Sequence, residues 1–163
     1  MKMPDAGPTL TMRPEDDPGW AAYAETVLRF PGGPALLEID LSIPVPPAAR
    51  SELAARGLAG PFGLVTPCNP RGRRSAPGEN EVRLARFLAE LDRLGTPYLR
   101  VDGFSPDRRH VEHGVALAWP QGEIVALARR WQQSAVYWWD GASFWVIGAL
   151  TTTEPWRLGN PAP

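Results

Sequence analysis

The segment Phe62–Glu81, FGLVTPCNPRGRRSAPGENE, combines polar residues that could bind a ligand. An apolar run leads to Asn69, then to a group of arginines that begins at Arg71, and then to Asn80 at the start of a helical pattern. Ligands of open α/β sheets bind beyond the carboxyl ends of strands, where the amide groups of a helix start point outward. This segment could therefore bind a phosphate or a carboxylate. It contains neither the Gly-Lys-Ser/Thr sequence of a nucleotide-binding loop nor a dinucleotide-binding glycine pattern.

The same segment also has a purely structural interpretation. Asn69 followed by proline is typical of a turn, and Ser75 has the residue type of a helix N-cap. The arginines would then be solvated loop charges, which is the simpler interpretation for Arg73 and Arg74 taken singly. Asn69 and Asn80 together favour a functional role.

Glu112, in RRHVEHGVALAW, is the second candidate. It could act in catalysis as a general acid or base, or it could accept a hydrogen bond from a ligand hydroxyl or amine. The alternative is a strand-end carboxylate paired with Arg108 or Arg109. On a strand, His110 would share the face of Glu112 and His113 would lie on the other face. The spacing matches no zinc signature, so we expect no metal and no cofactor.

Two further side chains belong with these candidates. Gln133 lies between a predicted helix and an aromatic strand, where it could satisfy buried backbone groups or contact a ligand. Cys68 lies beside the arginines, which would lower the pKa of its thiol. No histidine occurs in an identifiable partner motif, so a packing role is the simpler expectation for Cys68.

Alternating strand and helix patterns must position these residues. Apolar residues at helical spacing, alternating apolar residues, and proline or glycine at the boundaries mark the elements. We expect helices from Trp20, over 47–56, from about Leu84 to Gly95, and after Pro120, with strands over 35–43, 62–66, 97–103 and 111–119.

The aromatic segment SAVYWWDGASFWVIGA predicts a β-hairpin. Asp140-Gly141 fits a two-residue turn, which would place Trp139 opposite Ala142 and Tyr137 opposite Phe144. Both faces of this hairpin are too apolar to lie in water. We therefore expect an α/β or α+β fold: a mixed β-sheet flanked by helices, in a single-domain sandwich with a C-terminal β-hairpin.

Length and charge limit the classes of protein. The chain has 163 residues, 44% of them hydrophobic, which suits one domain over 18–150 with a flexible leader at 1–17 and an irregular tail at 151–163. With a net charge of −1, the chain has no excess of positive charge to attract phosphates, so we do not expect it to bind nucleic acid. One cysteine, no signal-peptide pattern and no membrane-length apolar stretch favour a cytoplasmic protein.

Short motifs resemble a bacterial family known as domain of unknown function 3293. WAAYAET is similar to its first motif, with Tyr23 and Thr26, and TPCNP is similar to its Thr-x-x-Asn-Pro segment. ENEVR is similar to a Glu-Asn dipeptide with a nearby arginine, which places Asn80 and Arg83. Glu112 and Gln133 fall at the family's later glutamate and glutamine. Two positions depart from the pattern: Gly114 lies where a serine is expected, and Gln132 replaces a common glycine. The resemblance spans roughly residues 20–149, and it implies no activity but points to a set of polar residues: Thr66, Asn69, Asn80, Arg83, Glu112 and Gln133.

The residues and the resemblance together give two hypotheses. The first is a site for a small anionic or nucleotide-like ligand, in which Arg71 and Arg83 hold the anion, Asn69 and Asn80 orient polar groups, and Glu112 acts as acid, base or acceptor. An enzyme would need Glu112 buried with a raised pKa. The second is a non-catalytic regulatory or protein-interaction module, which would show a contiguous apolar surface and no pocket beside Asn69.

Overall fold

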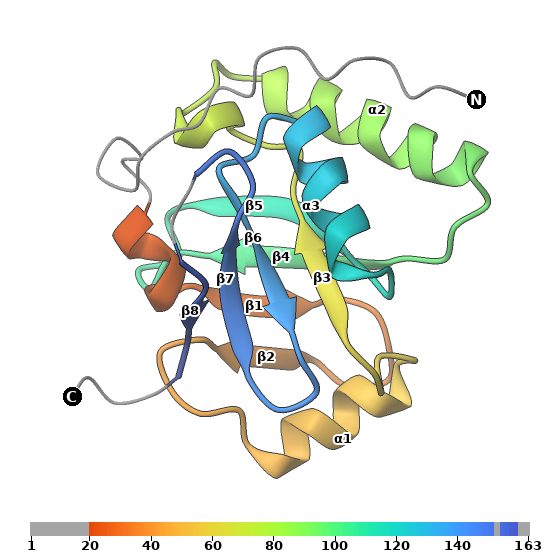
Figure 1. The fold of residues 1–163 in the computed structure, drawn as a ribbon, viewed down its shortest axis with the longest axis vertical. Helices are drawn as coiled ribbons and strands as arrows, with labels where there is room; N and C mark the ends of the chain where they lie inside the picture. The colour runs from red at the N-terminus through yellow and green to blue at the C-terminus, as the bar shows by residue number, and fades with distance from the viewer. Residues whose placement is uncertain (1–19, 152–153, 160–163) are drawn as a thin grey trace.

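One curled sheet of eight strands organises the chain in the computed structural model, which describes residues 20–151 and 154–159, with the side chains from residue 22 onward (Figure 1). Strand order across the sheet is β2-β1-β4-β5-β3-β6-β7-β8. A short 3₁₀ helix, η2 (Trp20–Glu25), precedes the sheet, and η3 (Pro70–Gly72) follows β3. The other elements are β1 (Val27–Phe30), β2 (Leu37–Asp40), α1 (Pro47–Ala55), β3 (Phe62–Val65), α2 (Glu79–Arg93), β4 (Leu99–Phe104), β5 (Val111–Leu117), α3 (Gln121–Arg130), β6 (Ala135–Trp139), β7 (Phe144–Gly148) and β8 (Trp156–Arg157).

The protein is of mixed α/β type, as expected, but its sheet is not mixed: each pairing among the described strands is antiparallel. The helical connections do join strands of the same direction, as alternating strands and helices predict. Other strands lie between them, however. For example, α3 links β5 to β6, and β3 lies between these two and pairs antiparallel with both.

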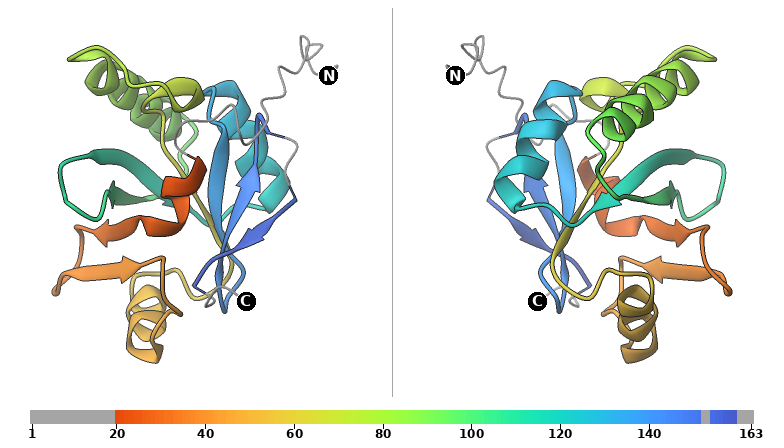
Figure 2. Two further views of the ribbon diagram at one scale, coloured as in Figure 1. Left: turned by 90° about the vertical axis from the view of Figure 1, so that its left-hand side faces the viewer. Right: turned by 90° about the vertical axis from the view of Figure 1, so that its right-hand side faces the viewer.

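Two hydrophobic cores lie on the two faces of the sheet. The inner face, which the curl encloses, carries one core and is covered by α1 through Ala49 and Leu53. The outer face carries the other core and is covered by α2 and α3, through residues such as Phe87 and Ile124. Figure 2 shows α1 at one end of the molecule and α2 and α3 at the other. Helices therefore pack against both faces of the sheet, while the sheet itself bends around part of its own core.

Strand β3, like β5 and β6, contributes buried residues to both cores. Phe62 and Leu64 pack into the inner core, and Val65 packs into the outer core. Gly63 lies beneath α3, because an added Cβ would come within 2.5 Å of Ile124. Burial on both faces explains why the FGLVT segment is continuously apolar.

Two local predictions are wrong. The helix expected from Trp20 ends at Glu25. The chain then extends as β1, because Leu28 and Phe30 alternate into the inner core.

The predicted two-residue hairpin turn is also wrong, because Trp139 pairs with Phe144 rather than with Ala142. Asp140 Oδ1 accepts hydrogen bonds from the backbone N–H groups of Ala142 (2.7 Å) and Ser143 (2.8 Å), so the turn takes four residues. The register shifts by two, which leaves the residues of each face unchanged.

The chain after β7 also pairs with the sheet. Within 151–163, which the sequence predicts as irregular, Trp156–Arg157 forms β8 on the edge of β7. The leader expected at 1–17 lies outside the described residues. None of the described helices is long and apolar enough to cross a membrane.

The bend between β5 and β3 requires a residue without a side chain at Gly114. A Cβ there would lie 2.5 Å from the carbonyl oxygen of Val65, which is part of the β3 backbone. We expect Gly114→Ala to lower the free energy of unfolding by about 1–3 kcal/mol, as overpacking does. Gly122→Ala is the matched control, because an added Cβ meets nothing within 4 Å there. Urea unfolding measures both, and equal stability of the two variants would contradict the close approach.

Candidate functional site

A pocket of about 290 Å³ opens on the inner face, between η2 and the strands at the bend of the sheet. Its apolar wall is formed by Leu28, Leu64, Val101 and Ala135, which come from four different strands. Its polar wall is formed by the end of β3 and the start of β5. Of the residues predicted from sequence, Thr66, Asn69, Glu112 and Gln133 all line this pocket.

Asn69 is the central residue of the polar wall. Its backbone is left-handed (φ 48°, ψ 62°), a conformation that asparagine tolerates better than most residues. Its side-chain Nδ2 donates a 2.7 Å hydrogen bond to Glu112 Oε1. Its Oδ1 accepts hydrogen bonds from the backbone N–H of Ser75 (3.0 Å) and from Asn80 Nδ2 (2.9 Å). The amide orientation is therefore fixed on both sides.

Asn80 supports Asn69 from α2 without lining the pocket. Its Oδ1 accepts a 2.9 Å hydrogen bond from the backbone N–H of Asn69, so the two asparagines bind each other reciprocally. Ser75, which has the residue type of an N-cap, does not cap α2. The N-cap position is Gly78, with φ of 86°.

Thr66, Arg83 and Gln133 hold the loop that contains Asn69. Thr66 Oγ1 donates to the carbonyl oxygen of His113 at 2.7 Å, where the β3–β5 ladder ends. Arg83 donates from Nε to the carbonyl oxygen of Pro67 (2.6 Å), and Gln133 donates from Nε2 to that of Cys68 (3.0 Å). Buried carbonyl groups in an irregular loop need such partners, so these side chains stabilise the loop.

The arginines lie apart from the pocket. The second guanidinium contact of Arg83 goes to the carbonyl oxygen of Trp131 at 2.8 Å, and neither Arg83 nor Arg71 lines the pocket. Arg71 contributes through its backbone, whose N–H donates to the carbonyl oxygen of Gln132 at 2.7 Å. Arg74 contacts the ring of His110, which lies at the rim.

Some lining residues were not among the sequence candidates. The Tyr137 hydroxyl lies 2.8 Å from the carbonyl oxygen of Tyr23 and 2.9 Å from Thr26 Oγ1, which attaches η2 to β6. The rings of Tyr23 and Tyr137 meet edge to face at 5.8 Å. The signal for Tyr23 and Thr26 was their place in the first motif of the family resemblance. Gly103 also lines the pocket, directly opposite Glu112 on the neighbouring strand.

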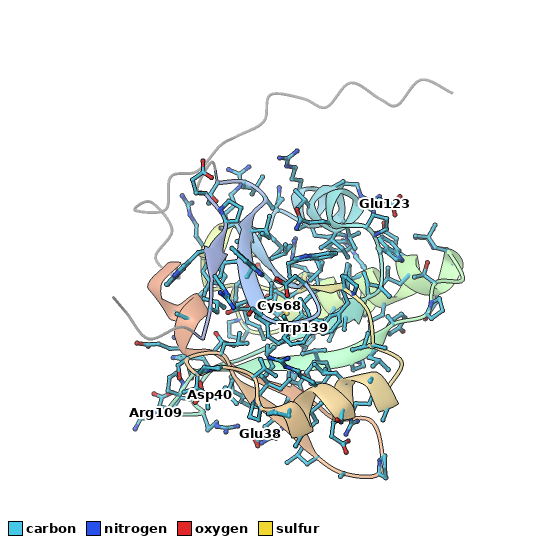
Figure 3. All side chains as sticks on the ribbon, turned by 60° about the horizontal axis from the view of Figure 1, so that its bottom comes forward. Glu38, Asp40, Cys68, Arg109, Glu123 and Trp139 are labelled. Carbon is cyan, nitrogen blue, oxygen red and sulfur yellow. The ribbon has the colours of Figure 1, made fainter. Side chains whose placement is uncertain are left out.

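Two acidic groups, the Cys68 thiol and the Tyr137 hydroxyl, have raised pKa values. Burial raises the pKa of the Cys68 thiol, and the negative charge of Glu112 adds to this effect. The arginines of the loop therefore do not activate Cys68, contrary to the expectation from sequence, and it lies in the interior (Figure 3). Burial also raises the pKa of Tyr137, and again Glu112 contributes.

The described acidic and histidine side chains around the site form ion pairs rather than a metal centre. Glu38, rather than Glu112, pairs with Arg108 at 2.7 Å. His113 contacts Asp102 at 2.6 Å on the outer face. Within residues 20–151 and 154–159, no group of three or more His, Cys, Asp or Glu side chains is arranged to hold a metal ion.

The profile of one protein family, described as "Protein of unknown function (DUF3293)", matches residues 65–136. The resemblance seen in the short motifs is therefore confirmed over this segment, which contains all six of the polar positions from Thr66 to Gln133. The motif with Tyr23 and Thr26 lies outside it. No curated protein and no solved structure matches the chain.

The structure explains the departure at Gly114, and at Gln132 it explains the expected glycine rather than the glutamine. Gly114 approaches the β3 backbone so closely that a serine there would clash. Gln132 has φ of 60°, a backbone conformation that favours glycine.

Replacing Gln132 by glycine relieves this backbone strain. We expect Gln132→Gly to raise the free energy of unfolding by about 0.5–1 kcal/mol, because the Cβ of a non-glycine residue is sterically unfavourable in a left-handed backbone. Gln121→Gly, in the first turn of α3, is the matched control and should be slightly destabilising. Thermal unfolding of the two variants tests this, and a Gln132→Gly protein less stable than wild type would disprove it.

Because the pKa of Tyr137 is raised by burial, we expect the protein to lose stability at alkaline pH. The pKa of Tyr137 in the folded protein lies above the unfolded value of about 10. The protonated hydroxyl therefore contributes fully to the free energy of unfolding below that pH. Above it, this contribution falls by up to about 1.4 kcal/mol per pH unit. Tyr137→Phe should lose about 1 kcal/mol at pH 7 through the missing hydrogen bond. The difference between variant and wild type should then shrink as pH rises past about 10. If the free energies of unfolding of Tyr137→Phe and wild type differ by the same amount at every pH in this range, the raised pKa of Tyr137 is contradicted.

Proposed function

We propose that the inner-face pocket binds a small molecule with an apolar body and one polar end. The observation that carries this proposal is the convergence on one concavity of an apolar wall (Leu28, Leu64 and Val101) and a fixed carboxylate–amide pair (Glu112 and Asn69). Ligand sites in proteins commonly combine a mostly apolar lining with a few well-placed polar groups.

The polar end of the ligand would meet Glu112, with Asn69, Thr66 and Gln133 around it. The anionic or nucleotide-like ligand expected from sequence required Arg71 and Arg83 to face the site. Arg83 instead binds two backbone carbonyl groups, and among the described lining residues there is no arginine or lysine. The composition of the wall therefore supports a ligand whose polar end donates hydrogen bonds.

The role we propose for Glu112 is that of a hydrogen-bond acceptor. A catalytic role, as general acid or base, would use the same position and is distinguished by turnover of the bound compound. The raised pKa of Cys68 argues against a thiolate nucleophile beside it at neutral pH. A cytoplasmic location belongs to the same proposal, supported by the single, buried cysteine.

The interaction-module hypothesis has less support. The exposed large apolar side chains of the described residues are spread over loops, α2 and its C-cap, β5 and β8: Leu36, Ile43, Val82, Leu94, Val111 and Trp156. A protein-binding surface would need them contiguous over several hundred Å². This hypothesis also predicts that no pocket lies beside Asn69, whereas Asn69 lines the inner-face pocket.

Gly103 provides a direct test of the pocket. It faces Glu112 across the β4–β5 pair, and an added Cβ would meet the nearest atom, Thr26 Cγ2, at 3.4 Å, an ordinary contact. Gly103→Leu should fill the pocket while the sheet remains intact, whereas Gly103→Ala should leave most of its volume.

The test is a thermal-shift screen of neutral, amine-bearing and phosphate-bearing fragments against wild type and both variants. We expect hits that raise the melting temperature of wild type and of Gly103→Ala but not of Gly103→Leu. Ligand at about 100 times its Kd stabilises by about 2.7 kcal/mol, which such a screen detects easily. Hits that stabilise Gly103→Leu equally, or hits confined to phosphate-bearing fragments, would contradict the proposed site.

A further inference from the structure

The side-chain amide of Gln133 is held in one orientation at the wall of the pocket. Gln133 lies between α3 and β6, is only 6% exposed and lines the pocket. Its Nε2 donates to the carbonyl oxygens of Cys68 (3.0 Å) and Trp131 (3.2 Å), which uses both of its hydrogens. The two carbonyl groups also fix which end of the amide is the nitrogen, because an oxygen in that place would face two acceptors.

The other end of this amide, Oε1, is an open hydrogen-bond acceptor. It has no hydrogen-bond partner among the described residues. The hydroxyl of Ser134, the next residue, also lacks a partner there, but it is fully enclosed, whereas Gln133 Oε1 is not. Leaving a mostly buried carbonyl oxygen without a donor is unfavourable, so a ligand that supplies an N–H or O–H gains binding free energy.

The hydroxyl donors of the same pocket are already used. Thr26 and Thr66 donate to backbone carbonyl oxygens at 3.0 and 2.7 Å, and the Tyr137 hydroxyl lies 2.8 Å from a third. These three groups have no hydrogen left for a ligand. Among the described lining residues there is also no arginine or lysine. A ligand that only accepts hydrogen bonds therefore fits this wall poorly, and a ligand that donates fits it well.

The apolar wall begins next to Gln133. Ala135, two residues further along the chain, lines the pocket at the start of β6, and Leu64 lines it from the neighbouring strand β3. A donor bonded to Gln133 Oε1 would therefore belong to an apolar body without a polar linker. A flat aromatic ring with an N–H in the ring has this composition, and it needs no donor in return.

We propose that Gln133 Oε1 recognises the ligand by accepting a hydrogen bond from a neutral N–H group within an aromatic ring, as in indoles and pyrroles. This inference deepens the proposed function and rests on it. It names the recognising atom and the class of ligand: small N–H heterocycles rather than ring compounds of the same shape that lack a donor. The proposed role of Glu112 is unchanged, since it would accept from a further donor on the ligand.

Three ring compounds of matched shape test the class: indole, benzofuran, which has no donor, and 1-indanone, which only accepts. Their dissociation constants are measured by NMR titration of wild type, of Gln133→Met, and of Gln121→Met, which changes an exposed glutamine of α3. We expect indole to bind wild type and Gln121→Met about 10-fold or more tightly than benzofuran, because benzofuran leaves Oε1 without a donor. In Gln133→Met this ratio should fall to about 2-fold or less.

A measurement on wild type accompanies the variant, because Gln133 Nε2 also holds the loop. The side-chain amide resonances of Gln133 should shift more on addition of indole than on addition of benzofuran, since only indole donates to Oε1. A purely structural role of Gln133 would weaken the binding of both compounds equally in Gln133→Met. If Gln133→Met does not fold, the wild-type affinities and this shift decide the matter.

The possible failures are distinct. If indole and benzofuran bind wild type equally, if 1-indanone binds best, or if indole keeps its advantage in Gln133→Met, the inference is overturned and the small-molecule site stands. The same holds if other fragments bind the pocket and indole does not. If none of the probes shifts the resonances of pocket residues such as Ala135, and Gly103→Leu abolishes no binding in the fragment screen, the proposed function fails as well.

Discussion

The left-handed backbone of Asn69, and the hydrogen bonds that hold it there, are the constraint on which the candidate site depends. The loop after β3 leaves the sheet at its sharpest bend, where regular backbone pairing has ended. Three side chains from two other segments replace that pairing: Asn80 and Arg83, one turn apart on α2, and Gln133, between α3 and β6. Because their contacts fix the loop, the side chain of Asn69 meets Glu112 in one orientation.

The pocket is a consequence of the curl. Antiparallel pairing through β3 brings β1, β4 and β5 to one side and β6 to the other, with η2 attached across them through Tyr137. Two glycines make room at this point. Gly114 permits the close approach of β5 to β3, and Gly103 leaves space opposite Glu112. The bend that demands a glycine thus also creates the concave surface.

Local patterns predicted most of the helices and strands. The polar set came from the family resemblance, and four of its members, Thr66, Asn69, Glu112 and Gln133, line one pocket. Local patterns could not show strand order, so the interposed strands and the purely antiparallel pairing were missed. The arginines were conspicuous in sequence, yet side-chain direction decides their role, and Arg83 turns toward backbone carbonyls. The apolar wall was also hidden, because Leu28, Leu64 and Val101 meet only after the sheet has formed.

The most direct test of this account is hydrogen–deuterium exchange at the backbone amides of Asn69 and Ser75. Both lie in an irregular loop, and both donate to asparagine side chains rather than to a backbone carbonyl group. The account predicts that both amides are protected in wild type and that both lose protection in Asn80→Ala, while amides of β5 keep theirs. Fast exchange of these two amides in wild type would show that the loop is not held, and it would contradict the claim that Asn69 is positioned against Glu112.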